Sequence, residues 1–182
     1  MYMAEYKLAT LGGGCFWCIE TAFNRLKGVE TAISGYCGGH TPDPRYKEIC
    51  QGDTGHAEVV QIRYDEAQIS FSRLLDAFFH LHDPTQLNRQ GNDMGTQYRS
   101  VIFYHDENQQ AEAQQAINDL GDSKVWPAPI VTELAPIARF YPAEDYHQDY
   151  FNQNPNQPYC ALLINPKLKS FQAQFNEWLK PD

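Results

Sequence analysis

A triple glycine, Gly12–Gly14, separates two patterns of different period and constrains the fold on both sides. Residues 6–11 (YKLATL) before it predict a short strand. After it, apolar residues recur at helical spacing as far as Gly28, namely Phe16, Ile19, Phe23 and Leu26. The sequence therefore predicts a strand, a tight turn and a helix, with Cys15 where the helix starts.

The rest of the chain mixes both periods. Strands are expected over residues 29–36, 56–64, 101–104 and 130–135, and helices over 71–82, 107–120, 142–151 and 168–179. Residues 37–55 are rich in turn formers, and residues 83–98 form a long loop of the kind that often carries function. Without strict alternation of strand and helix, an α+β two-layer domain is expected, and without a repeat or linker, residues 1–182 are interpreted as one domain.

Composition excludes several classes of protein. A formal net charge of −9 argues against a nucleic-acid binder, which would show a basic face. No apolar run is long enough to span a bilayer and the N-terminus does not resemble a signal peptide, so a cytoplasmic protein without a membrane partner is expected. In a reducing compartment the five cysteines are expected to be free thiols or buried residues before structural disulfides.

Cys15 is the first candidate for chemistry. At the start of a helix, free backbone amides and the helix dipole would stabilise a thiolate, which is a nucleophile at neutral pH. The glycines before it leave room for another molecule to approach the backbone. A lone cysteine more often belongs to the core, but this context favours the nucleophile.

The neighbours of Cys15 allow several interpretations. Phe16 and Trp17 either wall an apolar pocket beside the thiol or pack in the core. Cys18 lies on the same side of the helix and could be a redox partner. As half of a zinc site the pair would need two more ligands, and Cys37 and Cys50 are too far apart to form a second Cys-x-x-Cys, so no metal is expected.

Glu58 lies on the predicted strand with Val60 and Ile62 on the same face. A carboxylate on an apolar face either pairs or has its pKa raised, and a raised pKa makes it a general acid near neutral pH. The alternative is a glutamate at a fraying strand end. His56 shares the face and is interpreted as structural.

Other polar residues stand in the predicted loops. Tyr46 and Tyr98 could donate hydrogen bonds to a developing negative oxygen, although most tyrosines only pack. Asp93 either caps a turn, the favoured interpretation, or orders a water molecule. His147 and Asp149 could orient the backbone of a loop.

Four stretches resemble one family closely, the type A peptide methionine sulfoxide reductases. They are GGGCFWCIE, YKEICQGDTGHAEVVQI, HDPTQLNRQGNDMGTQYRS and FYPAEDYHQDYF, which follow the family's order over nearly the whole chain. The resemblance implies a ferredoxin-like two-layer sandwich with added helices and long loops. It also implies no metal, no organic cofactor and a monomer.

The resemblance assigns roles to the candidates. Cys15 would attack the sulfur of a methionine S-sulfoxide, free or within a protein, and take its oxygen as a sulfenic acid. Phe16 and Trp17 would hold the methyl group of the substrate, and Glu58 would protonate the sulfoxide oxygen. The physical chemistry agrees, because sulfoxide sulfur is a poor electrophile until its oxygen is protonated or strongly hydrogen-bonded.

The resemblance also implies that Tyr46 and Tyr98 bond the sulfoxide oxygen and that Asp93 assists through water. A second cysteine would resolve the sulfenic acid to a disulfide that thioredoxin reduces. Many members carry recycling cysteines in a glycine-rich tail, whereas here Cys160 precedes a closing helix. The candidates in order are Cys160, Cys18, Cys50 and Cys37, and direct reduction by an outside thiol stays open.

Two other functions fit parts of the sequence. A thioredoxin-like disulfide oxidoreductase would need Cys15 and Cys18 and not Glu58. A zinc-stabilised binding module would hold metal through several cysteines, and a metal assay would detect it.

Overall fold

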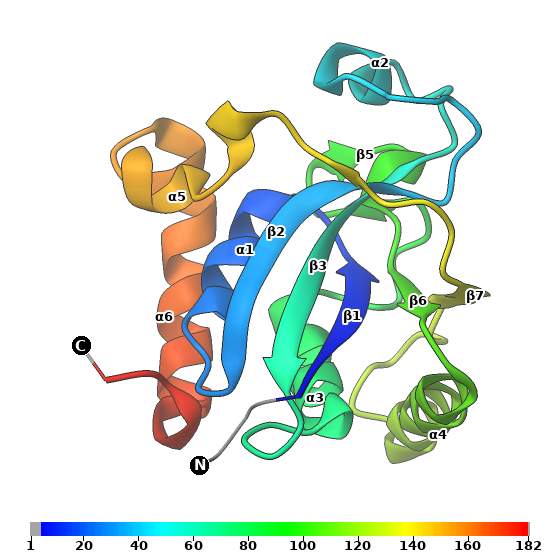
Figure 1. Ribbon diagram of the computed structural model, residues 1–182, viewed down its shortest axis with the longest axis vertical. Coiled ribbons are helices and arrows are strands. Elements are labelled where there is room, and N and C mark those ends of the chain that lie inside the picture. The colour runs from blue at the N-terminus through cyan, green and yellow to red at the C-terminus, as the bar shows by residue number, and fades with distance from the viewer. Residues whose placement is uncertain (1–4, 182) are drawn as a thin grey trace.

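The computed structural model describes residues 5–181, and within them the chain forms a six-stranded mixed sheet covered by helices (Figure 1). The strand order is β7-β6-β1-β3-β2-β8. Its strands are β1 (Tyr6–Gly12), β2 (Val29–Cys37), β3 (Ala57–Asp65), β6 (Val101–Tyr104), β7 (Glu133–Pro136) and β8 (Tyr141–Pro142), and a separate hairpin consists of β4 (Arg89–Gln90) and β5 (Asp93–Met94). The predicted α+β class is confirmed.

The helices are α1 (Phe16–Asn24), α2 (Tyr46–Gln51), α3 (Phe71–Leu81), α4 (Glu107–Ser123), α5 (Tyr150–Gln153) and α6 (Asn165–Gln174). Short 3-10 turns are η1 (Thr96–Tyr98), η2 (Asp145–His147) and η4 (Asn176–Trp178), and η3 (Cys160–Ile164) is a π-helix. The buried faces of α1, α3 and α6 form the main core against the sheet, which includes Phe23, Ile62, Phe78 and Phe171. Helix α4 packs against α3 and β6.

The element order β1-α1-β2-β3-α3-β6, with β6-β1-β3-β2 side by side, is the ferredoxin-like arrangement. Strand β3 is antiparallel to both β1 and β2, and β1 is antiparallel to β6. Consequently the end of β1, the end of β2, the start of β3 and the start of β6 all meet at one end of the sheet. The segments inserted there are α2 and the β4–β5 hairpin with η1.

The opposite face of the sheet carries a smaller apolar cluster. Cys37, Val59 and Phe103 belong to it, with Phe140 packed against them. In Figure 1 the chain that leads from β7 to β8 crosses this face. Its passage explains why the face is not open to solvent.

Several predicted elements match closely, among them β1, β2, β3, α3, α4 and β6. The helix predicted over residues 142–151 is wrong. Tyr141 and Pro142 instead form β8, which pairs with Tyr36 and Gly35, and the chain then makes η2 and the short α5. Side-chain ties explain the irregular path, because the amide of Gln148 bonds both backbone groups of Ser34.

Three further boundaries differ from the prediction. The strand predicted over residues 130–135 starts only at Glu133, where it joins β6 in parallel. Helix α2 was missed in a stretch that reads as turns. The final helix begins at Asn165 and ends at Gln174, earlier at both ends than predicted.

Among residues 5–181 no helix has both the length and the apolar character needed to cross a membrane.

The end of the described chain is hydrogen-bonded to the segment after α1, since Lys27 donates its amide to the Trp178 carbonyl at 2.7 Å. Lys180 donates to the Arg25 carbonyl at 2.8 Å.

Candidate active site

Cys15 lies at the end of the glycine turn, as the residue that precedes α1. Gly14 has a φ of +81°, which favours glycine, and its amide donates to the Tyr98 carbonyl at 3.1 Å. A Cβ at Gly13 would meet the His82 ring at 2.7 Å. The turn is therefore held closely between the loop that carries Tyr98 and the end of α3, and Cys15 is half-buried above it.

Glu58 lies on β3 opposite Tyr36 of β2 and is buried, with 1% of its surface exposed. Its Oε1 accepts the amide N–H of Phe16 at 3.2 Å, while its Oε2 is buried without a hydrogen-bond partner among the described residues. Burial raises the pKa of this carboxyl to about 8, against the Phe16 amide that lowers it, and the charge of Asp93 raises it further. Glu58 is therefore protonated at neutral pH.

The protonation state of the Cys15 thiol differs from the prediction. Burial and the charge of Glu58 raise the pKa of Cys15, and the amide of Trp17, which favours the thiolate, does not offset them. The expected thiolate at neutral pH is thus wrong for the resting site. The helix start lowers the pKa only where the dipole outweighs loss of solvent, and here solvent loss is the larger effect.

Tyr46 and Tyr98 reach this carboxyl from two different segments, α2 and η1. Burial raises the pKa of both phenols, and the charge of Glu58 is the second cause in each case. The Tyr46 hydroxyl is hydrogen-bonded to Cys50, and the charge of Cys15 also acts on Tyr98. Both phenols are therefore protonated donors beside Glu58.

Asp93, on β5, accepts a hydrogen bond from the hydroxyl of Tyr159. That hydroxyl is also hydrogen-bonded to the sulfur of Cys15. A cavity of about 20 Å³ lies beside the thiol, lined among others by Asp93, Tyr159, Cys18 and Lys167. Sequence reasoning missed Tyr159, whose only signal is a tyrosine next to Cys160 in a segment rich in helix breakers.

The two aromatics after Cys15 have different surroundings. Phe16 is fully buried and packs against Tyr36 and His147, with ring centroids 5.7 Å and 5.3 Å apart. Trp17 is half-buried, donates its Nε1 to Nδ1 of His147 at 2.9 Å, and stacks on Tyr150 with centroids 3.8 Å apart. Phe16 thus belongs to the core behind the site, whereas Trp17 forms part of its accessible wall.

The segment between β8 and α5 supports these residues from outside. Glu144 accepts the Tyr36 hydroxyl and the Tyr46 amide, each at 3.0 Å. Glu20 of α1, whose burial raises its pKa to about 7, accepts the amide of Asp149 at 2.8 Å. Asp149 has a φ of +56°, so this bond fixes a strained backbone position.

All five cysteines fall within the described residues and all are free thiols. Cys18 and Cys160 are buried in the main core, and Cys50 is exposed on α2. Cys37 belongs to the cluster on the opposite face of the sheet. The π-helix that begins at Cys160 follows Tyr159 directly, so Cys160 is the next residue along the chain from a group that bonds Cys15.

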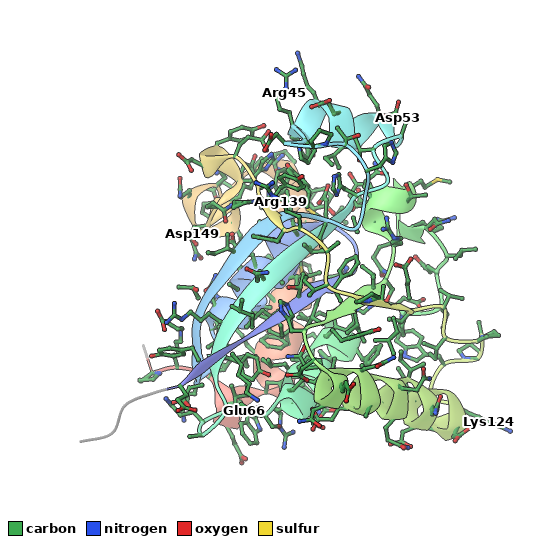
Figure 2. All side chains as sticks on the ribbon, turned by 45° about the vertical axis from the view of Figure 1, so that its right-hand side comes forward. Arg45, Asp53, Glu66, Lys124, Arg139 and Asp149 are labelled. Carbon is green, nitrogen blue, oxygen red and sulfur yellow. The ribbon has the colours of Figure 1, made fainter. Side chains whose placement is uncertain are left out.

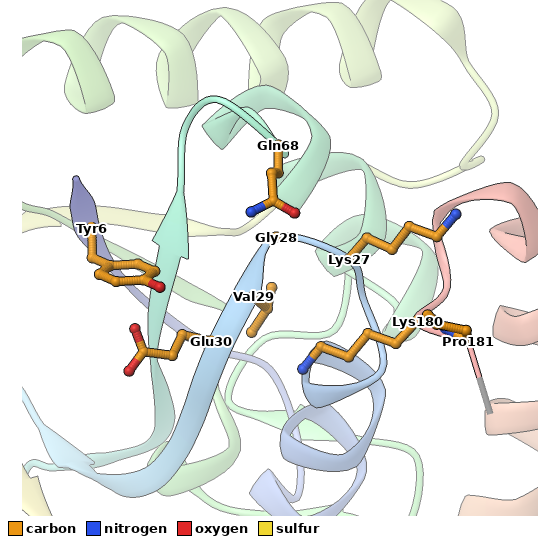
Figure 3. Close-up of a pocket in the computed structure, with 8 residues that line it drawn as sticks. All are labelled: Tyr6, Lys27, Gly28, Val29, Glu30, Gln68, Lys180 and Pro181. Atoms are coloured by element: carbon orange, nitrogen blue, oxygen red, sulfur yellow. The ribbon is translucent and has the colours of Figure 1, made fainter. Parts of the chain in front are cut away.

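The predicted site residues gather at one end of the sheet. In Figure 2, Arg45 and Asp53 flank α2 at this end, and Glu66 marks the other. A second pocket, shown in Figure 3, surrounds Lys27, Gly28 and Lys180, and none of the predicted residues lines it. Across residues 5–181 no three His, Cys, Asp or Glu side chains are grouped to hold a metal ion.

Comparisons with known proteins agree with one another. The sequence model of the family described as peptide methionine sulfoxide reductase matches residues 7–179. A relative from Chromobacterium violaceum, peptide methionine sulfoxide reductase MsrA, is 55% identical over 172 residues, which cover 94% of this chain and 98% of that one.

Solved structures are similar as well. Reduced Mxr1 from Saccharomyces cerevisiae matches with a TM-score of 0.77 and 38% identity, over 84% of this chain and 88% of that one. A structure of Mxr1 in complex with Trx2 matches with a TM-score of 0.55 and 25% identity, over 82% and 90% of the two chains.

Proposed function

The chain belongs to the peptide methionine sulfoxide reductase family, and we propose that Cys15 and Glu58 are the residues that reduce methionine S-sulfoxide in it. The observation that carries this assignment is the Glu58 carboxyl. It is buried, protonated at neutral pH, joined to the first turn of α1, and left with one oxygen free beside the thiol. A poor electrophile such as a sulfoxide needs such an acid.

In the proposed step, Glu58 donates its proton to the sulfoxide oxygen while the sulfur of Cys15 attacks the sulfoxide sulfur. The oxygen passes to Cys15, which becomes a sulfenic acid, and the substrate sulfur becomes the thioether of methionine. The thiol proton of Cys15 replaces the proton that Glu58 gave. The substrate gains two electrons and Cys15 loses two, so atoms and charges balance.

The raised pKa of Cys15 fits this order of events. Charge on Glu58 is the second cause of that shift, so a thiolate forms more readily while Glu58 is protonated. The site therefore favours one negative charge at a time. As the substrate oxygen draws the proton from Glu58, the sulfur of Cys15 loses its negative charge in the new bond to the substrate sulfur.

Tyr46 and Tyr98 are assigned to hydrogen-bond the sulfoxide oxygen, since both phenols are protonated donors close to Glu58. Trp17 is assigned to the methyl group of the substrate as the accessible wall, and Phe16 supports it from the core. Asp93 is assigned to assist the site, held there by the Tyr159 hydroxyl that also bonds Cys15.

Cys160 is assigned as the resolving thiol. It adjoins Tyr159, and it opens a π-helix, a feature that often occurs at functional sites. Its thiol would attack the sulfenic acid of Cys15, which releases water and forms a disulfide. Cys160 is buried, so its segment must move to do this; Cys18, which lines the cavity with Cys15, and exposed Cys50 are the alternatives.

Thioredoxin is the proposed reductant of that disulfide, supported by the likeness to Mxr1, which has been solved in complex with Trx2. Substrates would be oxidised methionine in proteins and free methionine sulfoxide. A single family model over residues 7–179 supports one domain, which we take to act as a monomer. Five free thiols and a thioredoxin-linked cycle support a cytoplasmic location.

The deciding experiment is single-turnover reduction of a methionine S-sulfoxide peptide by pre-reduced protein, with the R epimer as control and no added reductant. The expected result is S-selective product and loss of two thiols, which mass mapping assigns to Cys15 and Cys160. Product with one thiol lost would leave a sulfenic acid for an outside thiol. No product would overturn the reductase assignment.

The competing disulfide oxidoreductase rests on Cys15 before α1 and Cys18 in its first turn. It requires both cysteines and leaves Glu58 without a role. Loss of sulfoxide reduction in Glu58→Gln with activity kept in Cys18→Ser supports the reductase, and the reverse pattern supports the rival.

A further inference from the structure

Helix α2 carries Tyr46 at its first position and is short. Of its six residues, all described, only Ile49 is buried. In Figure 1 it lies apart from the sheet, at the end where the site is. A helix this short has little stability of its own, so its place depends on tertiary contacts at its ends.

Glu144 supplies such a contact. One carboxylate oxygen accepts the Tyr46 amide, which is a free donor at the start of α2, and the other accepts the Tyr36 hydroxyl, each at 3.0 Å. Tyr36 lies on β2 directly opposite Glu58. One carboxylate therefore joins the first residue of α2 to the strand beside the proposed acid.

The two carboxyls on either side of Tyr36 are in opposite protonation states. Burial alone would raise the pKa of Glu144, but the Tyr46 amide, the backbone amide of Glu144 itself and the Tyr36 hydroxyl outweigh it and lower the pKa. Glu144 is thus ionised at neutral pH. Hydrogen bonds to an ionised acceptor are about twice as strong as neutral ones.

We propose that Glu144 is a positioning residue for sulfoxide reduction, whose carboxylate fixes the start of α2 and thereby holds the Tyr46 hydroxyl against the substrate oxygen. The inference rests on the proposed function, because it needs the sulfoxide oxygen to bind beside Glu58 and Tyr46. Glu144 itself does not touch the substrate. Its effect acts through the place of one phenol.

The test compares variants of Glu144 with a matched control in single-turnover reduction of an S-sulfoxide peptide. Glu144→Ala should lower the rate of the chemical step by about tenfold to a hundredfold, the scale of a misplaced catalytic group. Glu144→Gln should recover most of it, because the amide oxygen still accepts from Tyr46 and the amide nitrogen can donate to the Tyr36 hydroxyl. Asp145→Ala, the exposed neighbouring carboxylate, is the matched control.

The discriminating readout is a double-mutant cycle with Tyr46→Phe. If Glu144 acts through the Tyr46 hydroxyl, Glu144→Ala should cause less than about a threefold further loss once that hydroxyl is absent. Full additivity of the two losses would overturn the proposal. A loss of rate in Tyr36→Phe as large as the loss in Glu144→Ala would also overturn it, because Tyr36→Phe leaves the hydrogen bond between Glu144 and α2 in place.

A structural defect gives a different pattern. Local loosening of the whole site would also change the rate at which iodoacetamide alkylates Cys15, and an unchanged rate in Glu144→Ala is expected. A changed alkylation rate together with failed rescue by Gln would count against the proposal. Failure of the proposed function is separate, since the wild-type protein would then form no S-selective product.

Discussion

The amide of Phe16 and the carboxylate oxygen of Glu58 meet at 3.2 Å, which joins the first turn of α1 to β3 beside the proposed nucleophile. A helix start normally offers its free amides to an anion or a capping side chain. Here one of them is given to a carboxyl that is protonated at neutral pH. The amide therefore orients the acid without making it lose its proton.

The first prediction concerns the chemical step. Glu58→Gln should lower the single-turnover rate by about a hundredfold to ten-thousandfold, the range of general acid catalysis, with unchanged circular dichroism. In the wild type the rate should fall as pH rises through about 8, because Glu58 then ionises. Reduction by Glu58→Gln at near the wild-type rate would remove the general-acid role.

The second prediction concerns stability. The folded pKa of Glu58, about 8, lies above its ordinary value of 4.5, so the folded protein binds the proton more tightly than the unfolded chain does. Glu58 therefore destabilises the fold increasingly as pH rises from its ordinary pKa towards about 8. Glu58→Gln should raise the free energy of unfolding at neutral pH by on the order of 2–4 kcal/mol.

Urea unfolding of both proteins across this pH range measures the difference. It should be small at acid pH and grow until about pH 8. A difference that is constant with pH would mean that the carboxyl is already ionised in the folded state.

The third prediction concerns the reactivity of Cys15. The charge of Glu58 is the second cause that raises the pKa of this thiol, so Glu58→Gln should move the pH profile of its alkylation to lower pH. Iodoacetamide with mass mapping of the Cys15 peptide follows the profile. A shift to higher pH would contradict the electrostatic coupling.

The fourth prediction separates the two aromatics. Phe16 is fully buried, so Phe16→Ala should cost about 3–5 kcal/mol of stability, as core truncations do. Trp17 is half-buried, so Trp17→Ala should weaken apparent substrate affinity by about tenfold with a smaller loss of stability. Thermal melts and the substrate dependence of the rate measure both. Unchanged affinity in Trp17→Ala would remove its role in holding the methyl group.

Elements with strong periodicity could be predicted from the sequence, because their apolar faces are set locally. Helix α3 and strand β3 are examples, and the face that carries Glu58, Val60 and Ile62 follows from the period of a strand. The gathering of Cys15 and Glu58 at one end of the sheet follows from the ferredoxin-like order of the strands.

What could not be predicted depends on contacts between distant parts of the chain. Helix α2 is short and polar, and its first amide is bonded by Glu144, which lies far along the sequence. The irregular path after β8 depends on side chains such as Gln148 that bond the backbone of β2. Tyr159 joins the site only because its segment folds back to Cys15. The raised pKa of Cys15 could not be predicted either, because it results from burial of the thiol, which the position of a helix start does not reveal.

Strand β3 lies between β1 and β2, so the part of the site on this strand is expected to be more rigid than the parts on the loops around it. From Val60 to Tyr64 its backbone pairs with neighbours on both sides, so amides in this stretch should exchange with solvent deuterium only on the slowest, near-global opening, and Glu58 lies two residues before it, paired with β2. The two phenols proposed to bond the substrate oxygen, Tyr46 and Tyr98, lie instead on a short helix and a 3-10 turn, which should open at lower cost. Insertions and substitutions in those segments can change which substrates the enzyme accepts, while the proton donor Glu58 stays on a central strand of the sheet.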